Sequence, residues 1–283
     1  MITMWQINYQ VKNLVSSHRG TLPVILTCPH EGDSQPPGVP PRTGQGLPAG
    51  CNFETDHDLK TRTITTGVAQ RVLDICGEAP YVVMADFKRD YIDANRPNST
   101  RTPNCAYEVP AAKPFYDEYH RTIRSFITEI RAENGGLGLL FDVHGTVGIP
   151  GALADVYLGT DDGKTIKRLL QVDPQAMGRR RSLHSLLTAA SYAVLPTPPG
   201  LSVPSKLNGG HTVKTYGSSH ADGLDAIQLE IDDRLRKDET GGTVRAQFIE
   251  HLAYAIRSLI AQYADSHTIA AFRHINLISL GAP

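Results

Sequence analysis

Two histidines stand where apolar segments of the sequence end, and each is close to a glycine. They are His30, in the run Pro29-His30-Glu31-Gly32, and His144, in Asp142-Val143-His144-Gly145. An imidazole in such a position can point into a cleft while the backbone bends away. A mononuclear catalytic zinc takes nitrogen and carboxylate ligands and keeps one position open for water. The two histidines, together with a carboxylate, therefore predict one metal ion per chain, and this ligand chemistry suits zinc and several other divalent metals.

Two carboxylates are candidates for the third ligand. Asp56 lies in the run Glu54-Thr55-Asp56-His57-Asp58, where we expect a helix to start near the site, and Asp33 follows His30 by three residues. Asp33 has a second explanation, because an aspartate among glycines can also cap a turn. From the residues alone, the choice between Asp56 and Asp33 stays open.

Glu230 is a candidate for the general base of a hydrolysis. It lies in the apolar run Gln228-Leu229-Glu230-Ile231, and an ionised carboxylate is costly to bury without a partner. Burial would raise its pKa towards the value that suits a base, which could then pass the proton to a leaving amine. The alternative is a glutamate that faces solvent on an edge strand.

Arg96 is a candidate for binding a substrate carboxylate. It follows Asn95 and precedes Pro97, which fixes the backbone just after it. A guanidinium held in this way can form a two-pronged contact with a carboxylate, which Lys cannot match. Asp90 and Asp93 could orient it, and the alternative is a surface ion pair between Arg96 and Asp93.

The elements that must position these residues follow from the apolar pattern. Five runs are typical of buried strands: Leu22 to Cys28, Tyr81 to Phe87, Leu137 to His144, Asp155 to Gly159 and Leu224 to Ile231. Helical spacing appears around Val68 to Ile75, from Phe115 to Ile130, and from Thr243 towards Ala264. Alternating strands and helices predict an α/β sheet, which binds ligands beyond the carboxyl ends of its strands. Segments rich in Pro and Gly, at about 32–51 and 195–223, are expected as long loops over the site.

Length and composition limit the remaining possibilities. With 283 residues, of which 40% are hydrophobic, we expect one catalytic domain over 1–283. Lys and Arg total 28 against 29 Asp and Glu, so the chain has no broad positive charge with which to bind nucleic acid. The start of the chain does not have the pattern of a signal peptide, and no stretch of eighteen apolar residues predicts a membrane span.

The four cysteines are far apart and contain no C-x-x-C pair. They are Cys28, Cys51, Cys76 and Cys105. This spacing argues against a thiolate zinc site and against a disulfide framework. We therefore expect reduced thiols and a cytoplasmic location.

Six short motifs, taken in order, resemble those of the N-formylglutamate amidohydrolases. They are Pro29-His30-Glu31-Gly32, Thr55-Asp56, Asp93-Ala94-Asn95-Arg96, Asp142-Val143-His144-Gly145, Asn208-Gly209-Gly210 with Tyr216-Gly217, and Gln228-Leu229-Glu230-Ile231. The match covers about Leu22 to Asp232. The resemblance implies a three-layer α/β fold similar to zinc carboxypeptidases and aspartoacylases (phosphorylase/hydrolase-like), with a mixed, mostly parallel sheet and helices on both faces.

The resemblance also implies an activity and roles for individual residues. The activity would be hydrolysis of N-formyl-L-glutamate or a related N-acyl amino acid to formate and the amino acid, in histidine degradation. His30, Asp56 and His144 would bind zinc, with Asp33 as the alternate ligand, and Glu230 would be catalytic. Asn95 and Arg96 would hold the substrate carboxylate, and the Gly209-Gly210 loop would close over it.

The sequence departs from the family in that last loop. The segment Lys206-Leu207-Asn208-Gly209-Gly210-His211-Thr212-Val213-Lys214 lacks the family's Pro and Phe. Lys214, together with His211, His220 and Arg89, could reshape the pocket for another acyl group or a second carboxylate.

Two other functions agree with the same residues. One is a carboxypeptidase-like peptidase or amidase on larger peptides, which needs an open cleft. The other is a metal-free protein that binds acidic metabolites through Arg96. The sequence does not determine whether the chain is a monomer or a homo-oligomer.

Overall fold

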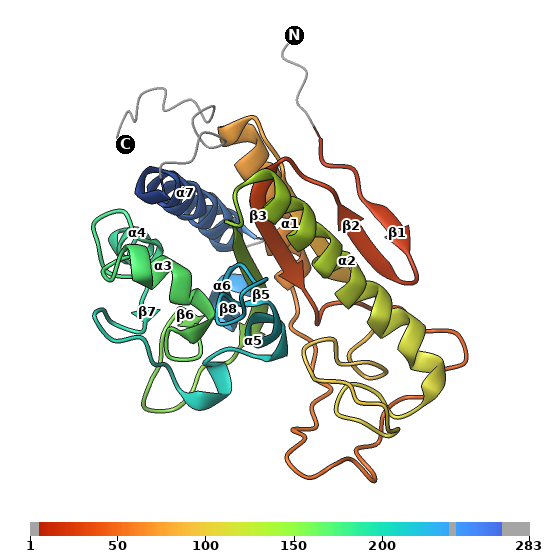
Figure 1. The fold of residues 1–283 in the computed structure, drawn as a ribbon. Helices are drawn as coiled ribbons and strands as arrows, with labels where there is room; N and C mark the ends of the chain where they lie inside the picture. The colour runs from red at the N-terminus through yellow and green to blue at the C-terminus, as the bar shows by residue number, and fades with distance from the viewer. Residues whose placement is uncertain (1–5, 238–241, 268–283) are drawn as a thin grey trace.

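The protein, seen in a computed structural model, is described over residues 6–237 and 242–267 (Figure 1). The strands are β1 (Gln10–Lys12), β2 (Val15–His18), β3 (Leu22–Cys28), β4 (Pro80–Ala85), β5 (Leu139–Thr146), β6 (Val156–Gly159), β7 (Val194–Leu195) and β8 (Asp225–Asp232). The α-helices are α1 (Thr61–Cys76), α2 (Lys113–Glu133), α3 (Lys167–Val172), α4 (Leu183–Ala189), α5 (His211–Tyr216), α6 (Asp233–Arg236) and α7 (Thr243–His267). Short 3-10 helices are η1 (Pro110–Ala112), η2 (Lys164–Ile166) and η3 (Ser205–Leu207).

The strands form one mixed sheet in the order β1-β2-β4-β3-β5-β8-β6-β7. Its central strands β4, β3, β5 and β8 are all parallel to one another. Strands β2 and β6 flank them in the antiparallel direction. The predicted mixed, mostly parallel sheet is confirmed, and its four central strands have their carboxyl ends at one edge.

Helices cover both faces of this sheet, because successive side chains of a buried strand point to opposite faces. In β4, Val82 and Met84 belong to an apolar cluster with α1 and α7. Tyr81 and Val83 belong to a second cluster, with α2. Figure 1 shows α2 crossing one face of the strands, with α1 and α7 on the other. The predicted helices on both faces are therefore confirmed.

The elements that the sequence pattern missed are short. Strands β1 and β2 have the sequences QVK and VSSH, which are too short and too polar to show the run of a buried strand. The segment 195–223, expected as a loop, contains the six-residue helix α5. Six residues span less than two turns, so no repeat of the helical period could show in the sequence.

The cysteine prediction is wrong for one pair. Cys51 and Cys105 form a disulfide, with Cα atoms 5.2 Å apart, while Cys28 and Cys76 are free. The paired cysteines lie in two loops that the fold brings together, and their separation of 54 residues gave no signal. Because disulfides are rare in reducing compartments, the cysteines no longer support the expected cytoplasmic location.

Within the part of the chain that the structure describes, every helix is too short or too polar to cross a bilayer. Residues 1–5, part of the start where no signal peptide was expected, lie outside the described residues. So do residues 238–241 and 268–283 of the expected domain.

The disulfide leads to a prediction about stability. Replacing Cys51 and Cys105 together by Ser should lower the free energy of unfolding by about 2–4 kcal/mol, because the crosslink restricts the unfolded chain. Urea denaturation measures this value. Dithiothreitol should destabilise the wild type by a similar amount and leave the double variant unchanged. Equal stability of oxidised and reduced wild type would contradict the bond.

Candidate active site

The predicted site residues gather at the carboxyl edge of the parallel strands. His30 follows β3 by two residues, and His144 lies near the end of β5. Glu230 of β8 is the direct partner of His144 in the β5–β8 register. All three residues are buried. The sheet therefore brings together residues that are 86 to 200 positions apart in the sequence.

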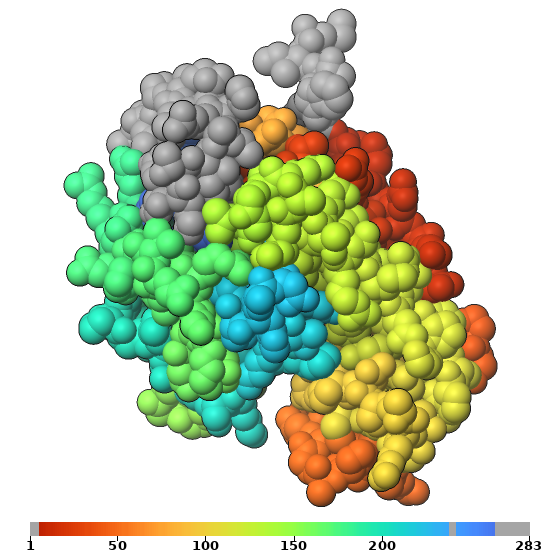
Figure 2. Space-filling model, viewed as in Figure 1, coloured from red at the N-terminus to blue at the C-terminus, as the bar shows by residue number. Residues whose placement is uncertain are grey.

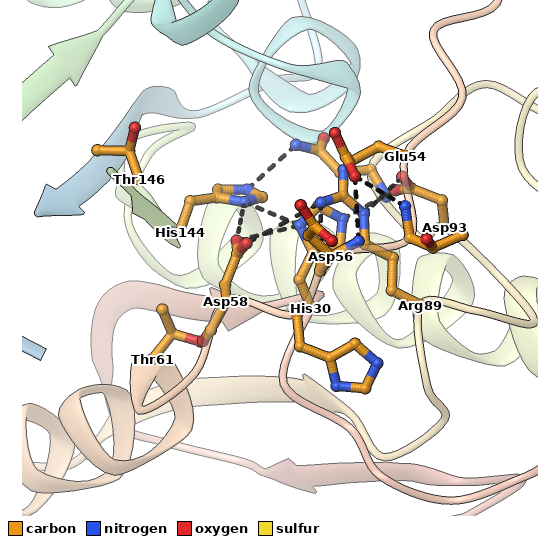
Figure 3. Close-up of polar contacts among 12 residues, drawn as sticks. His30, Glu54, Asp56, Asp58, Thr61, Arg89, Asp93, His144 and Thr146 are labelled. Carbon is orange, nitrogen blue, oxygen red and sulfur yellow. Dashed lines mark hydrogen bonds and ion pairs between the residues drawn. The ribbon is translucent and has the colours of Figure 1, made fainter. Parts of the chain in front are cut away.

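His30, His144 and Asp58 form the core of the site. The Nδ1 atom of His30 lies 3.2 Å from Oδ2 of Asp58, and the Nδ1 atom of His144 lies 3.1 Å from the same oxygen. The two Nδ1 atoms are 3.2 Å apart. Figure 3 shows Asp58 and His144 pointing toward one another, with dashed contacts that join them to the residues around His30.

These distances match the spacing of ligands around zinc. Ligand atoms about 2.0–2.2 Å from the ion and separated by a tetrahedral angle lie roughly 3.3–3.5 Å apart. The three observed separations are within about 0.4 Å of that range, and all three atoms face one another. Two imidazole nitrogens and one carboxylate oxygen therefore fit a single divalent cation in both chemistry and spacing.

The outer nitrogen of each histidine has its own carboxylate. His30 Nε2 lies 2.8 Å from Oδ1 of Asp93, and His144 Nε2 lies 2.8 Å from Oδ2 of Asp142. Thr27 donates a hydrogen bond of 2.6 Å to the other oxygen of Asp142. Such partners orient metal-ligating imidazoles and raise their basicity. Both Nδ1 atoms are thus left to face the centre of the cluster.

Charge in this cluster shifts several pKa values. Burial acts to lower the pKa of His144, but the Asp142 and Asp58 carboxylates outweigh it and raise this pKa well above its usual value. Burial acts to raise the pKa of Asp58, yet the two histidines hold it below its usual value. The pKa of Asp93 is lowered in the same way, with His30 and Arg89 outweighing burial. Asp58 and Asp93 are therefore held ionised.

The structure does not bring Asp56 or Asp33 into this group. Both residues are exposed, whereas Asp58 is buried between the two histidines. Asp33 accepts a hydrogen bond from the neighbouring Ser34, and the backbone carbonyl of Asp56 accepts one from Arg89. The carboxylate suited to a cation is Asp58, which takes the place expected for Asp56 or Asp33.

Local structure fixes Asp58 at the start of α1. Its backbone N–H donates to the carbonyl of His30 at 3.2 Å, and its own carbonyl accepts from the Thr61 hydroxyl at 2.6 Å. One signal in the sequence pointed here: the buried face of α1, which includes Ile64 and Thr61, continues three residues earlier to position 58.

Glu230 has a fixed orientation and a raised pKa. Gln228 donates a hydrogen bond of 2.7 Å from Nε2 to Glu230 Oε1. Burial raises the pKa of Glu230 to about 7, and the nearby Asp58 and Asp142 add to the effect of burial. Glu230 therefore matches the expected buried carboxylate, and the edge-strand alternative is wrong because β8 lies between β5 and β6.

Gln228 also connects Glu230 to the glycine loop. Its Oε1 accepts a hydrogen bond of 2.6 Å from the backbone N–H of Gly210. A Cβ atom at Gly210 would lie 2.3 Å from the Asn95 amide, so only glycine fits at this approach. Asn95 in turn accepts a hydrogen bond of 2.8 Å from the backbone of Thr212. These contacts hold the loop against the strand end.

Arg96 lines the same cavity, which has a volume of about 190 Å³. Its Nε donates to the Asn52 carbonyl at 3.1 Å and its Nη1 to the Asn95 carbonyl at 3.0 Å. The Arg96–Asp93 ion pair is long, at 3.9 Å, and Asp90 is instead near His57. Figure 2 shows the surface hollowed between the orange and yellow segments and the cyan segment, which hold the two walls of this cavity.

Of the three residues predicted in the glycine loop, Gly209, Gly210 and Lys214, only Gly210 lines the cavity. Lys214 forms an ion pair of 3.3 Å with Asp161 and does not line the cavity, and neither does Gly209. Gly210 does line it, as does Lys206, which is exposed. A lysine of this loop therefore does line the cavity, but it is Lys206, eight positions before the predicted Lys214.

Sequence reasoning gave no role to Asp142, Gln228 or Lys206. The first two lie in motifs that it singled out, each two residues before a candidate site residue. In a strand, that spacing places both side chains on the same face, which was the available signal. Lys206 had no such signal, because its position depends on how the loop folds.

Curated relatives support the resemblance seen in the sequence. The N-formylglutamate deformylase of Pseudomonas aeruginosa is 25% identical over 283 residues, which cover 87% of this chain and 94% of the relative. The N-formylglutamate deformylase of Pseudomonas putida is 25% identical over 262 residues, with 80% and 86% covered. No family model matches the chain. The resemblance to N-formylglutamate amidohydrolases is thus confirmed.

Solved structures share the fold. The N-formylglutamate amidohydrolase from Ralstonia eutropha has a TM-score of 0.52 at 16% identity, covering 84% of this chain and 93% of that one. The gene product Atu2144 from Agrobacterium tumefaciens has a TM-score of 0.54 at 17% identity, covering 90% and 94%. These similarities confirm the α/β fold class.

The geometry predicts which aspartate binds a cation. Asp58→Asn should weaken Zn²⁺ binding by more than about 100-fold, since the loss of a partner outside the ligand shell already costs about 10–100-fold. Isothermal titration with Zn²⁺ measures the affinity. The matched variants Asp56→Asn and Asp33→Asn should bind as the wild type does. Normal affinity in Asp58→Asn, or a loss in either control, would reject the assignment.

Proposed function

We propose that this chain is a metal-dependent amidohydrolase that cleaves the amide of an N-acyl amino acid, with N-formyl-L-glutamate as the first substrate to test. The whole chain would form one catalytic domain. The observation that carries the proposal is the buried His30, Asp58 and His144 cluster, with Glu230 in register beside His144 and Arg96 in the same cavity. The names of the curated relatives support the substrate class.

His30 and His144, through their Nδ1 atoms, and Asp58, through Oδ2, would hold one Zn²⁺ or a similar divalent cation. When bound, the cation polarises the scissile carbonyl and makes a water molecule more acidic. Asp93 and Asp142 keep the two imidazoles in the orientation that this requires.

Glu230 would move the proton. Its Oε1 accepts from Gln228, so Oε2 is the atom that takes a proton from the attacking water. With a pKa near 7, the carboxyl group can accept this proton and then return it to the departing amine nitrogen. Burial, which raises this pKa, therefore suits Glu230 to both steps.

Arg96 and Asn95 would bind the carboxylate of the amino acid. Two nitrogens of the Arg96 guanidinium donate to backbone carbonyls, which hold it in place, while Nη2 has no partner among the described residues. This leaves one donor edge for a substrate carboxylate. Lys206 lines the same cavity and could meet the second carboxylate of an acidic amino acid.

Formate release from N-formyl-L-glutamate by the Zn²⁺-loaded protein tests the proposal. The wild type should release formate, and Glu230→Gln should lower kcat by about 100-fold or more while binding of Zn²⁺ is unchanged, because only the proton transfer is lost. His144→Ala should lose both formate release and Zn²⁺ binding. Activity that survives in Glu230→Gln would reject the base. Ligand binding without hydrolysis in the wild type would favour a metabolite-binding protein.

A second variant tests the carboxylate contact. Arg96→Lys should lower kcat/KM for N-formyl-L-glutamate by about 30-fold, or roughly 2 kcal/mol, because a two-pronged charged contact is lost. Steady-state kinetics at low substrate concentration measure this ratio. Arg101→Lys, in the exposed loop nearby, serves as the matched control and should leave the ratio unchanged. An unaltered ratio in Arg96→Lys would reject the contact.

A further inference from the structure

A second, larger groove continues from the catalytic cavity. Its volume is about 840 Å³, compared with about 190 Å³ for the cavity itself. The two share Asp58, Gly145 and Thr146, which adjoin the proposed cation position, as well as Glu54, Arg89, Lys206 and Leu207. Arg96 and Asn95 line only the cavity. The groove therefore starts at the proposed reacting centre and extends on the side away from Asn95 and Arg96.

The groove has an apolar surface that the fold leaves uncovered. Leu59, directly after Asp58, is 46% exposed, and Val147, three residues after His144, is 75% exposed. Ile149, Pro150 and Leu207 also line the groove. Exposed apolar side chains that gather in a groove, rather than singly, mark a binding surface.

Arg236 fixes the separation between the two apolar sides. Its guanidinium donates to the carbonyl of Leu59 through Nη1 and to that of Thr146 through Nη2, the latter at 3.2 Å. A Cβ atom at Gly145 would lie 2.3 Å from this guanidinium, so glycine is required there. The groove is thus held open by a buried residue rather than by chance contacts of surface loops.

Several ionisable residues that line the groove have partners, either within it or just outside it; Arg89, for example, donates to Asp93. Asp233 forms ion pairs with Arg236 and with Lys237, the latter at 2.9 Å. His57 lies 3.6 Å from Asp90. Asp56 and Lys206 are exposed and make the rim polar. Beside these charges, the groove offers a bound molecule the exposed apolar side chains of Leu59 and Val147.

We propose that the groove binds an apolar acyl group larger than formyl, so that the substrates include N-acyl amino acids with a medium-length aliphatic or an aryl acyl group. This inference rests on the proposed function, because it orients the substrate by Arg96 and the cation site. In the reaction, the amide C–N bond breaks, water supplies the new C–O bond, and a proton passes to the amine nitrogen. The products are the longer carboxylic acid and the free amino acid.

A pair of substrates that differ only in the acyl group tests the groove. The wild type should cleave N-hexanoyl-L-glutamate with a kcat/KM at least about tenfold higher than N-formyl-L-glutamate, because each buried methylene favours binding. Val147→Asp should lower the value for the hexanoyl substrate about tenfold or more and leave that for the formyl substrate within about twofold. Val11→Asp, at a valine 65% exposed on β1, is the matched control and should change neither.

Binding measurements keep this test separate from the proposed function. Calorimetry on the Zn²⁺-loaded Glu230→Gln protein should show tighter binding of N-hexanoyl- than of N-formyl-L-glutamate, and addition of Val147→Asp should remove the difference. If this difference in binding is seen but the wild type hydrolyses neither substrate, the groove would still be an acyl-binding site and the proposed hydrolase activity would be rejected. A wild type that prefers the formyl substrate, or a Val147→Asp variant that affects both substrates equally, would overturn the acyl site.

Discussion

The burial of negative charge at one edge of the sheet is the constraint on which the site depends. Asp58, Asp93, Asp142 and Glu230 are all buried there, and an uncompensated buried carboxylate is very costly. Arg89 offsets part of this charge through a hydrogen bond of 2.9 Å to Asp93. The two imidazoles offset part of the remaining negative charge. The same field that raises the pKa of His144 favours a divalent cation, which would replace the proton and hold more positive charge.

The parallel sheet makes this concentration of charge possible. Its carboxyl ends meet at one edge, and the period of two along each strand places Asp142 with His144 and Gln228 with Glu230 on shared faces. The apolar residues between them, such as Val143 and Leu229, point into the core that α1 and α7 cover. Alternate side chains of each strand thus pack into the core, and the side chains between them face the proposed site. This arrangement explains why the residues proposed to be functional lie at the strand ends or a few positions past them.

Sequence patterns predicted the parts of the molecule that obey such a period. Strands β3, β4, β5, β6 and β8, the three long helices, His30, His144 and Glu230 all follow from apolar runs and from what ends them. Loops have no repeating pattern, so the predictions for loop residues were wrong or left a choice between alternatives. Asp56 and Asp58 differ by two positions in one acidic run, and only the backbone contacts of Asp58 with His30 and Thr61 separate them. Cys51 and Cys105 give a similar case, since two loops must fold before the thiols can meet.

The same division separates chemistry from specificity. The groups proposed to bind the cation and move the proton stand on or beside strand ends, where packing on both faces of the sheet fixes them. Much of the wall of the cavity and groove comes from segments around Asn52, Val147 and Lys206, which lie outside the strands and α-helices. Such segments tolerate change better than buried strands do. In the proposed binding mode, a substrate with its carboxylate at Arg96 would have its acyl group in the groove, so different residues would select the two ends. Selection for the acyl group could therefore vary without any change to the groups proposed to perform the hydrolysis.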